Sequence, residues 1–144
     1  MKALDVSKYI LNKCTVESQP ISNLQLQKIL YYVQHEFLLK YNKALFEDDF
    51  AAWKFGPIIP FIYHIYSTAG GMKIDEKYDD ISMALFKTED LQIIDSVVEK
   101  HRIRDPWDLV DETHKEGKAW DKIFNKGTGF KQIISKELIK ECAF

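Results

Sequence analysis

The 144-residue chain is short of the signals that mark secreted, membrane and strongly basic proteins. It has only two cysteines, Cys14 and Cys142, without a paired spacing, so we expect reduced thiols and a cytoplasmic protein. The sequence has no run of about 18 apolar residues and no signal peptide, which predicts no membrane association. Its net charge of −2 argues against binding nucleic acid through bulk charge.

Signatures of catalysis are missing as well. The glycine pairs at Gly70–Gly71 and Gly127–Gly129 match neither common phosphate-binding loop, and no Gly-x-Ser-x-Gly elbow occurs. His35 begins the sequence His-Glu-Phe-Leu-Leu, which lacks the second histidine of a zinc-protease motif. The acidic cluster Glu47–Asp49 is interpreted as a solvated charge run rather than a cation site. We therefore predict no catalytic residue, no metal and no cofactor.

One enzymatic alternative stays open, a metal-assisted hydrolase that uses His64, His114 and Glu116. It requires these side chains to converge within about 2.0–2.2 Å of one metal ion. The simpler interpretation is that His114 caps a helix end or hydrogen-bonds in the core. By the same reasoning, His64 belongs to an aromatic packing surface between Tyr63 and Ile65.

What the sequence does contain is a series of helical patterns. The clearest begins at Ser22, where Gln25 three residues later completes a capping box, and ends near Tyr41 with Asn42 as its C-terminal cap. The predicted helices cover Asp5–Cys14, Ser22–Tyr41, Pro60–Ser67, a segment from a Thr88 cap to about His101, Asp105–His114, Lys118–Asn125 and Ser135–Cys142. The fold class is therefore mainly α, a compact single-domain helical bundle over residues 1–144 with at most a short β-hairpin or small sheet.

Two segments between the helices are expected to be irregular or extended. Residues Phe46–Phe55 show a period of two at Ala51, Trp53 and Phe55, which predicts a short extended segment. Residues Met72–Phe86 are mixed, and we expect a loop with a short strand. Gly56 and Pro57, which follow the first segment, predict a rigid bend that holds Trp53, Lys54 and Phe55 in a fixed arrangement. Rigid aromatic and basic groups suit protein recognition better than they suit bond chemistry.

The chain carries separated sequence blocks that resemble a known family over about residues 21–124. The blocks are Leu26-Gln27-Lys28-Ile29-Leu30-Tyr31-Tyr32, Leu45-Phe46, Ala52-Trp53-Lys54-Phe55-Gly56-Pro57-Ile58, Leu109 through Thr113-His114, and Ala119-Trp120. In this order they resemble the Panacea domain, also called the SocA-like antitoxin domain or a phage-associated domain of unknown function. Phe55 stands where the family usually has Tyr, and Ile58 where it usually has Val.

This resemblance implies a noncatalytic, mainly helical protein of bacteria and their phages or prophages. Family members often bind and neutralise a co-encoded toxin, and one branch presents the toxin to a protease as an adaptor. The expected partners are therefore a toxin protein and a protease or its adaptor. Only about twenty residues precede the motif, too few for the DNA-reading extension of other members, so no nucleic-acid binding by the chain itself is expected. A phage-encoded host-interaction or structural protein without a toxin is the alternative.

The candidate residues follow from these motifs. The predicted partner-binding surface comprises Lys54, Phe55, Gly56, Pro57, Tyr63, His114 and Glu116. The predicted structural residues of the motif are Leu26, Lys28, Tyr31, Tyr32, Trp53, Thr113 and Trp120. For Trp53, Gly56, Pro57 and Trp120 the alternative of a purely conformational or core role stays open.

Overall fold

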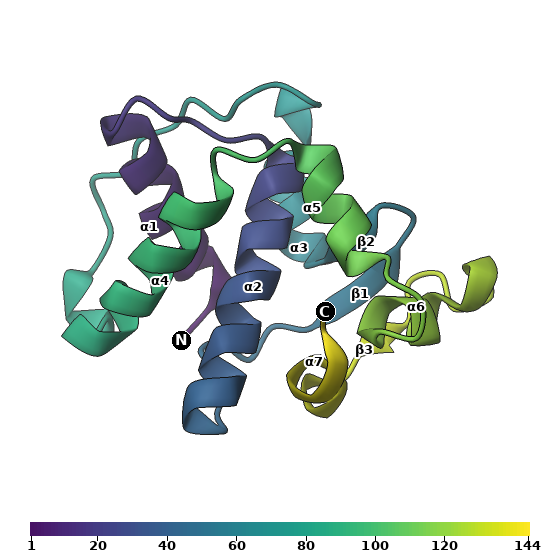
Figure 1. Ribbon diagram of the computed structural model, residues 1–144. Coiled ribbons are helices and arrows are strands. Elements are labelled where there is room, and N and C mark those ends of the chain that lie inside the picture. The colour runs from purple at the N-terminus through teal and green to yellow at the C-terminus, as the bar shows by residue number, and fades with distance from the viewer.

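The computed structural model describes all residues from Met1 to Phe144 as helices around one central helix, with a small sheet at one side (Figure 1). The α-helices are α1 (Ala3–Val16), α2 (Asn23–Tyr41), α3 (Pro60–Ile65), α4 (Thr88–His101), α5 (Pro106–Thr113), α6 (Ala119–Phe124) and α7 (Lys136–Cys142). The short 3₁₀ helices are η1 (Ser67–Ala69), η2 (Met83–Leu85) and η3 (Asn125–Gly127), and the strands are β1 (Phe50–Trp53), β2 (Gly56–Ile58) and β3 (Ile133–Ile134). The mainly α fold class is confirmed.

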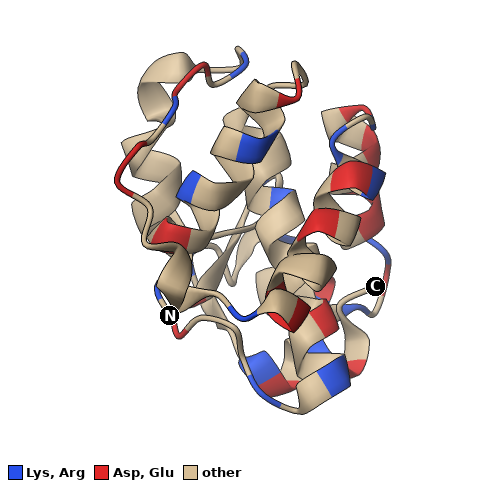
Figure 2. Ribbon diagram, turned by 90° about the vertical axis from the view of Figure 1, so that its left-hand side faces the viewer, with Lys and Arg blue, Asp and Glu red and all other residues tan.

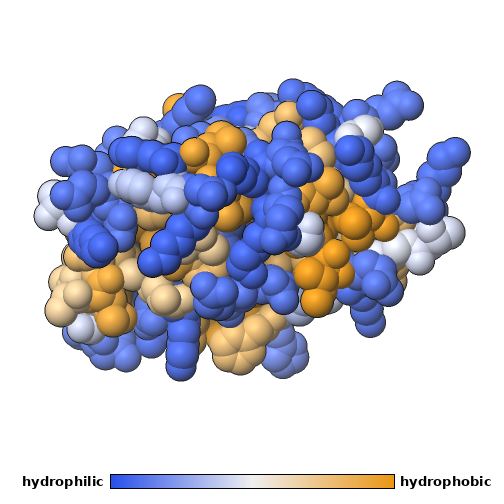
Figure 3. Space-filling view, turned by 90° about the horizontal axis from the view of Figure 1, so that it is seen from below, coloured by the Kyte–Doolittle hydropathy of each residue, from blue (hydrophilic) through white to orange (hydrophobic).

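Charged and apolar residues are both distributed over the surface. Basic and acidic residues are mixed on the side drawn in Figure 2, which carries α1 and α4. Seen from below, apolar side chains reach the surface in separate patches between hydrophilic ones (Figure 3). None of the helices combines the length and the apolar character needed to cross a bilayer.

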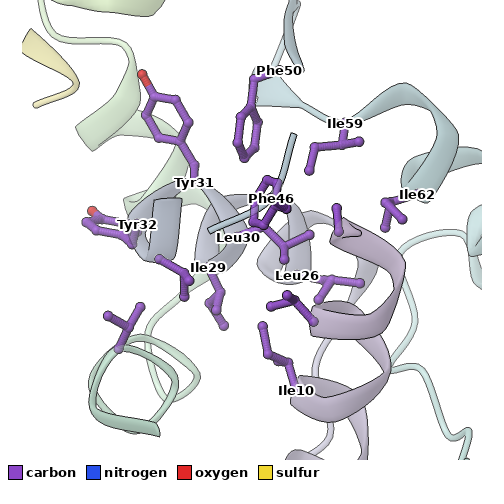
Figure 4. Close-up of a cluster of buried hydrophobic side chains, with 14 of the residues drawn as sticks. Ile10, Leu26, Ile29, Leu30, Tyr31, Tyr32, Phe46, Phe50, Ile59 and Ile62 are labelled. Carbon is purple, nitrogen blue, oxygen red and sulfur yellow. The ribbon is translucent and has the colours of Figure 1, made fainter. Parts of the chain in front are cut away.

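Helix α2 organises the fold because it contacts α1, α3, α4, α5, α7 and strand β2. The predicted capping box is present, with Ser22 Oγ accepting from the Gln25 backbone and the Gln25 side chain accepting from the Ser22 backbone. At its other end Asn42 adopts the predicted left-handed conformation, with φ 51°. Leucine, isoleucine and tyrosine side chains of α2 fill the core toward α1 on one side and toward Phe46 and Phe50 on the other (Figure 4).

The small sheet is antiparallel, with strand order β2-β1-β3. Strands β1 and β2 form a hairpin in which Trp53 is paired with Gly56, so Lys54 and Phe55 make the turn. The predicted extended segment is thus confirmed, although Phe55 belongs to the turn and not to the strand. Strand β3 pairs Ile133 with Ala51 and was not predicted, because a two-residue strand leaves no periodic pattern in the sequence.

Three local predictions were wrong. Asp5 does not cap the first helix: α1 begins at Ala3, whose backbone N–H donates to Asp48 Oδ1 at 2.8 Å. Thr88 is the first residue of α4 and not its cap, and no side chain caps that end. Between residues 72 and 86 the chain forms no strand; it makes a single bridge of Lys73 with Ser22 and the 3₁₀ turn η2. The contact of Asp48 with α1 could not be predicted from the sequence, because a cap supplied by a distant segment has no fixed spacing.

Candidate functional site

A lysine buried without an acid partner lies at the centre of the motif residues. Lys28 projects from α2, has no exposed surface, and donates from Nζ to the carbonyl oxygen of Pro57 at 3.0 Å. Burial lowers the pKa of Lys28 to about 7 because no neighbouring carboxylate offsets the loss of solvation. The contact connects the central helix to strand β2.

Gly56 lies against this lysine in a conformation that favours glycine, with φ +106°. A Cβ atom at this position would lie 2.6 Å from Thr113 Oγ1 and 2.9 Å from Lys28 Cε. The hydroxyl of Thr113 is itself fixed, because it donates to the carbonyl of Val110 at 2.7 Å. Strand β2, helix α2 and helix α5 therefore meet at one position that has room only for glycine.

Polar side chains of α2 extend the attachment along the chain that forms the hairpin. Gln27 Oε1 accepts from the backbone N–H of Ile59 at 2.8 Å. About two turns further along the same face, Gln34 accepts from the backbone of Leu45 at 2.9 Å and donates to the carbonyl of Phe46 at 2.8 Å. Both glutamines are fully buried. Sequence reasoning missed them; the available signal was their place in a helix whose other buried residues are mostly apolar.

The second half of the motif supports the hairpin from the opposite side. His114 lies flat on Trp120, with ring centroids 3.7 Å apart and an interplanar angle of 1°. Trp120 Nε1 in turn donates to the carbonyl of Trp53 at 2.8 Å. Burial and the proximity of Lys28 lower the pKa of His114, which favours its neutral form. His114 is half-buried, and its ring helps to support the hairpin through Trp120. The Nε2 atom of His114 and the Nε1 atom of Trp53 are buried and have no hydrogen-bond partner in the chain.

Above this support, aromatic side chains form an exposed cluster. Phe55 in the hairpin turn is 44% exposed and meets Trp107 of α5 edge-on, with centroids 5.1 Å apart. Trp53 lies within 5.4 Å of the Tyr63 ring and within 6.1 Å of the Phe130 ring, centroid to centroid. We call Trp53, Phe55, Tyr63, Trp107 and Phe130 the aromatic surface. Sequence reasoning missed Trp107 and Phe130, because both lie outside the recognised blocks.

The predicted partner-binding residues differ in how far they are exposed to solvent. Lys54, Phe55 and Glu116 are exposed, and Tyr63 and His114 are half-buried. Gly56 and Pro57 are buried in strand β2, next to the turn. Glu116 makes no ion pair in the turn between α5 and α6.

The remaining predicted residues have structural surroundings. Leu26, Tyr31 and Tyr32 are buried in the core, where Tyr32 lies between His101 and Phe144 in two stacked contacts. No three histidine, cysteine, aspartate or glutamate side chains come together as a group that could hold a metal ion. The ligand set of the hydrolase alternative, His64 with His114 and Glu116, is therefore not assembled.

Comparisons with known proteins agree with the motif residues. The family model of the antitoxin SocA-like Panacea domain matches residues 26–121, well over half of the chain. A curated relative, Antitoxin SocA of Caulobacter vibrioides (strain NA1000 / CB15N), is 42% identical over 65 residues, which are 45% of this chain and 35% of that protein. The chain thus matches about a third of the length of that relative. No solved structure matches.

Proposed function

Because the chain belongs to the antitoxin SocA-like Panacea domain family, we propose that it is an antitoxin that neutralises a toxin protein by direct contact. The family supports the antitoxin role in general. The identity of the contact surface is our inference from the arrangement of Lys54, Phe55 and Trp107.

The observation that carries the proposal is an exposed aromatic turn on an immobile base. Phe55 and Trp107 keep about half of their surface in solvent. Beneath them, Gly56 and Lys28 are fixed by contacts that leave no free volume. Large aromatic side chains held in place in this way bind proteins well, because little conformational entropy is lost when the complex forms.

The proposed mode of action is occlusion rather than chemistry. The motif residues make structural hydrogen bonds and stacked contacts, and His114 is used in the support of the hairpin. A stable interface would bury on the order of 1,600 Å² in total, with a few aromatic anchors providing most of the affinity. Phe55 and Trp107 are the anchors that we propose.

Co-expression with the neighbouring reading frame tests the proposal. We expect the wild-type chain to restore growth of cells that express the toxin and to elute with it as one complex from a sizing column. The Phe55→Ala/Trp107→Ala variant should fold but lose rescue. The matched control is Met83→Ala in η2, which removes an apolar side chain of similar exposure, 48%, from the other side of the molecule (Figure 1).

The amount of toxin in the cell separates two ways of neutralising it. Occlusion leaves the toxin abundant and bound, whereas delivery to a protease lowers its amount in a protease-dependent manner. Absence of both rescue and a complex with the wild-type chain would reject the antitoxin proposal. Rescue that is unchanged in the double variant would reject the aromatic surface as the site while leaving the antitoxin role in place.

A further inference from the structure

Acidic residues are absent from two long parts of the sequence. Residues 50–74 contain Lys54 and Lys73 but no Asp or Glu, and residues 122–136 contain four lysines and no Asp or Glu. All 22 acidic residues of the chain therefore lie elsewhere, although the net charge is −2. The lysines of the second part are Lys122, Lys126, Lys131 and Lys136.

The fold brings these two parts together. The backbone N–H of Lys131 donates to the carbonyl of Ala52 at 2.8 Å, and the N–H of Ala52 donates to the carbonyl of Gln132 at 2.9 Å. Trp53 and Phe130 are in ring contact across the same pair of segments. The hairpin and the region around α6 and η3 lie on the same side of the molecule (Figure 1). The result is one face that carries lysines from both segments. Acidic residues flank these segments: Asp49 pairs with Lys136, Asp121 lies in α6, and Asp108 and Asp111 lie in α5.

Three lysines on this face are exposed, and their ammonium groups have no hydrogen bond or ion pair within the chain: Lys54, Lys126 and Lys131. Two of them extend over exposed aromatic rings, with Lys54 Nζ 5.5 Å from the Phe55 centroid and Lys131 Nζ 5.3 Å from the Phe130 centroid. An ammonium group over the face of an aromatic ring is attracted by the ring quadrupole, which keeps it beside the exposed ring. By contrast, Lys136 is already paired with Asp49.

We propose that this face, built from the hairpin turn at Lys54–Phe55 and the loop 126–131, recognises an acidic surface of the toxin, with Lys54 and Lys131 pairing with its carboxylates beside the aromatic anchors. The inference rests on the proposed antitoxin function and adds the chemistry of the partner. Charge complementarity favours an acidic partner here, because lysines without acidic partners gather on this face although the chain as a whole has a net charge of −2. Loop 126–131 lies outside the family match at residues 26–121.

The test measures the affinity of the purified toxin for the purified chain at low and high salt. The Lys54→Gln/Lys131→Gln variant is compared with Lys77→Gln/Lys100→Gln, which removes the same charge from exposed positions without hydrogen bonds on other elements. We expect the first variant to bind about five- to tenfold more weakly at low salt, with a smaller loss at high salt because salt screens such pairs. The control variant should bind like the wild type.

The other outcomes are distinguishable. Equal affinity of the wild type and the Lys54→Gln/Lys131→Gln variant would overturn the charge-recognition inference while the antitoxin function stands. An equal loss in the control variant would overturn it too, because net charge and not this face would then be responsible. No complex with the wild-type chain would reject the antitoxin function itself. Binding of a labelled single-stranded RNA oligonucleotide that is lost only in the Lys54→Gln/Lys131→Gln variant, with toxin affinity unchanged, would assign the face to nucleic acid and overturn the inference.

Discussion

Replacing Gly56 by alanine is expected to destabilise the protein because one methyl group would collide with two elements at once. The added Cβ would lie 2.6 Å from Thr113 Oγ1 and 2.9 Å from Lys28 Cε, both shorter than any normal contact. Neither neighbour moves easily. Thr113 is held by Val110, and Lys28 has no exposed surface and donates to the carbonyl of Pro57.

Two contributions set the magnitude. A side chain at the positive φ of Gly56 costs roughly 1–2 kcal/mol through its own backbone sterics. Overpacking of a filled interior adds about 1–3 kcal/mol. The expected loss is therefore about 2–5 kcal/mol, which lowers the melting temperature of a domain of this size by roughly 10 °C.

Gly127→Ala is the matched control. Gly127 has φ +102°, close to that of Gly56, but a Cβ atom there would meet nothing within 4 Å. Both variants pay the backbone cost and both reduce the entropy of the unfolded chain, so these contributions cancel in the comparison. Urea unfolding of the two variants should differ by about 1–3 kcal/mol, the packing contribution alone.

A double-mutant cycle with Thr113→Ala tests whether Thr113 causes the destabilisation by Gly56→Ala. In a Thr113→Ala chain the closest atom is gone, so Gly56→Ala should cost less than in the wild type, with a coupling energy of about 0.5–3 kcal/mol. If Gly56→Ala proves no more damaging than Gly127→Ala, or if its cost is the same in both backgrounds, then the three elements do not meet as tightly as described.

Three further predictions concern single contacts. Between pH 7 and about 9, the free energy of unfolding should rise by up to about 1.4 kcal/mol per pH unit. The reason is that buried Lys28, with its pKa of about 7, loses its proton in the folded state, whereas the unfolded chain keeps it. Urea titrations of Lys28→Met should show a flatter rise, and a slope equal to that of the wild type would contradict the burial of this lysine. Asp48→Ala should cost about 1 kcal/mol in chemical unfolding through loss of the α1 cap, and a larger cost for Asp5→Ala would restore the sequence-based cap. Trp120→Phe keeps the stacked ring but loses the bond to the carbonyl of Trp53, so thermal unfolding should show a loss of about 1–3 kcal/mol, and no loss would mean that water replaces the indole.

The helices could be predicted from the sequence wherever their signals are local. The capping box of Ser22 and Gln25 and the left-handed Asn42 lie within a few residues of the backbone groups that they satisfy, and α2 has its predicted bounds within one residue. The same holds for α5, which begins with Asp105 accepting from the backbone of Trp107. Local hydrogen bonds have fixed spacing and are therefore readable.

The site was only partly predictable, because its contacts join distant segments. The motif blocks identified Lys28, Gly56 and Thr113 as related residues, but no spacing rule states that they touch. Trp107 lies on a helix whose turn-by-turn pattern gives no sign that its ring meets Phe55. For the same reason, the sequence left open whether Gly56 and Pro57 are exposed or have a conformational role; in the structure both are buried, and Gly56 lies against side chains of α2 and α5.

The attachment of the hairpin has a consequence for how the protein can change. Lys28, Gln27 and Trp120, which anchor it, are buried. Lys54 and Phe55 at its tip are exposed, and their side chains contact one another and Trp107. Substitutions at the tip are therefore expected to change the stability of the fold very little, while they change the shape and charge of the surface that meets a partner. Changes at a few exposed positions can therefore alter which protein the hairpin binds, while the buried scaffold stays the same.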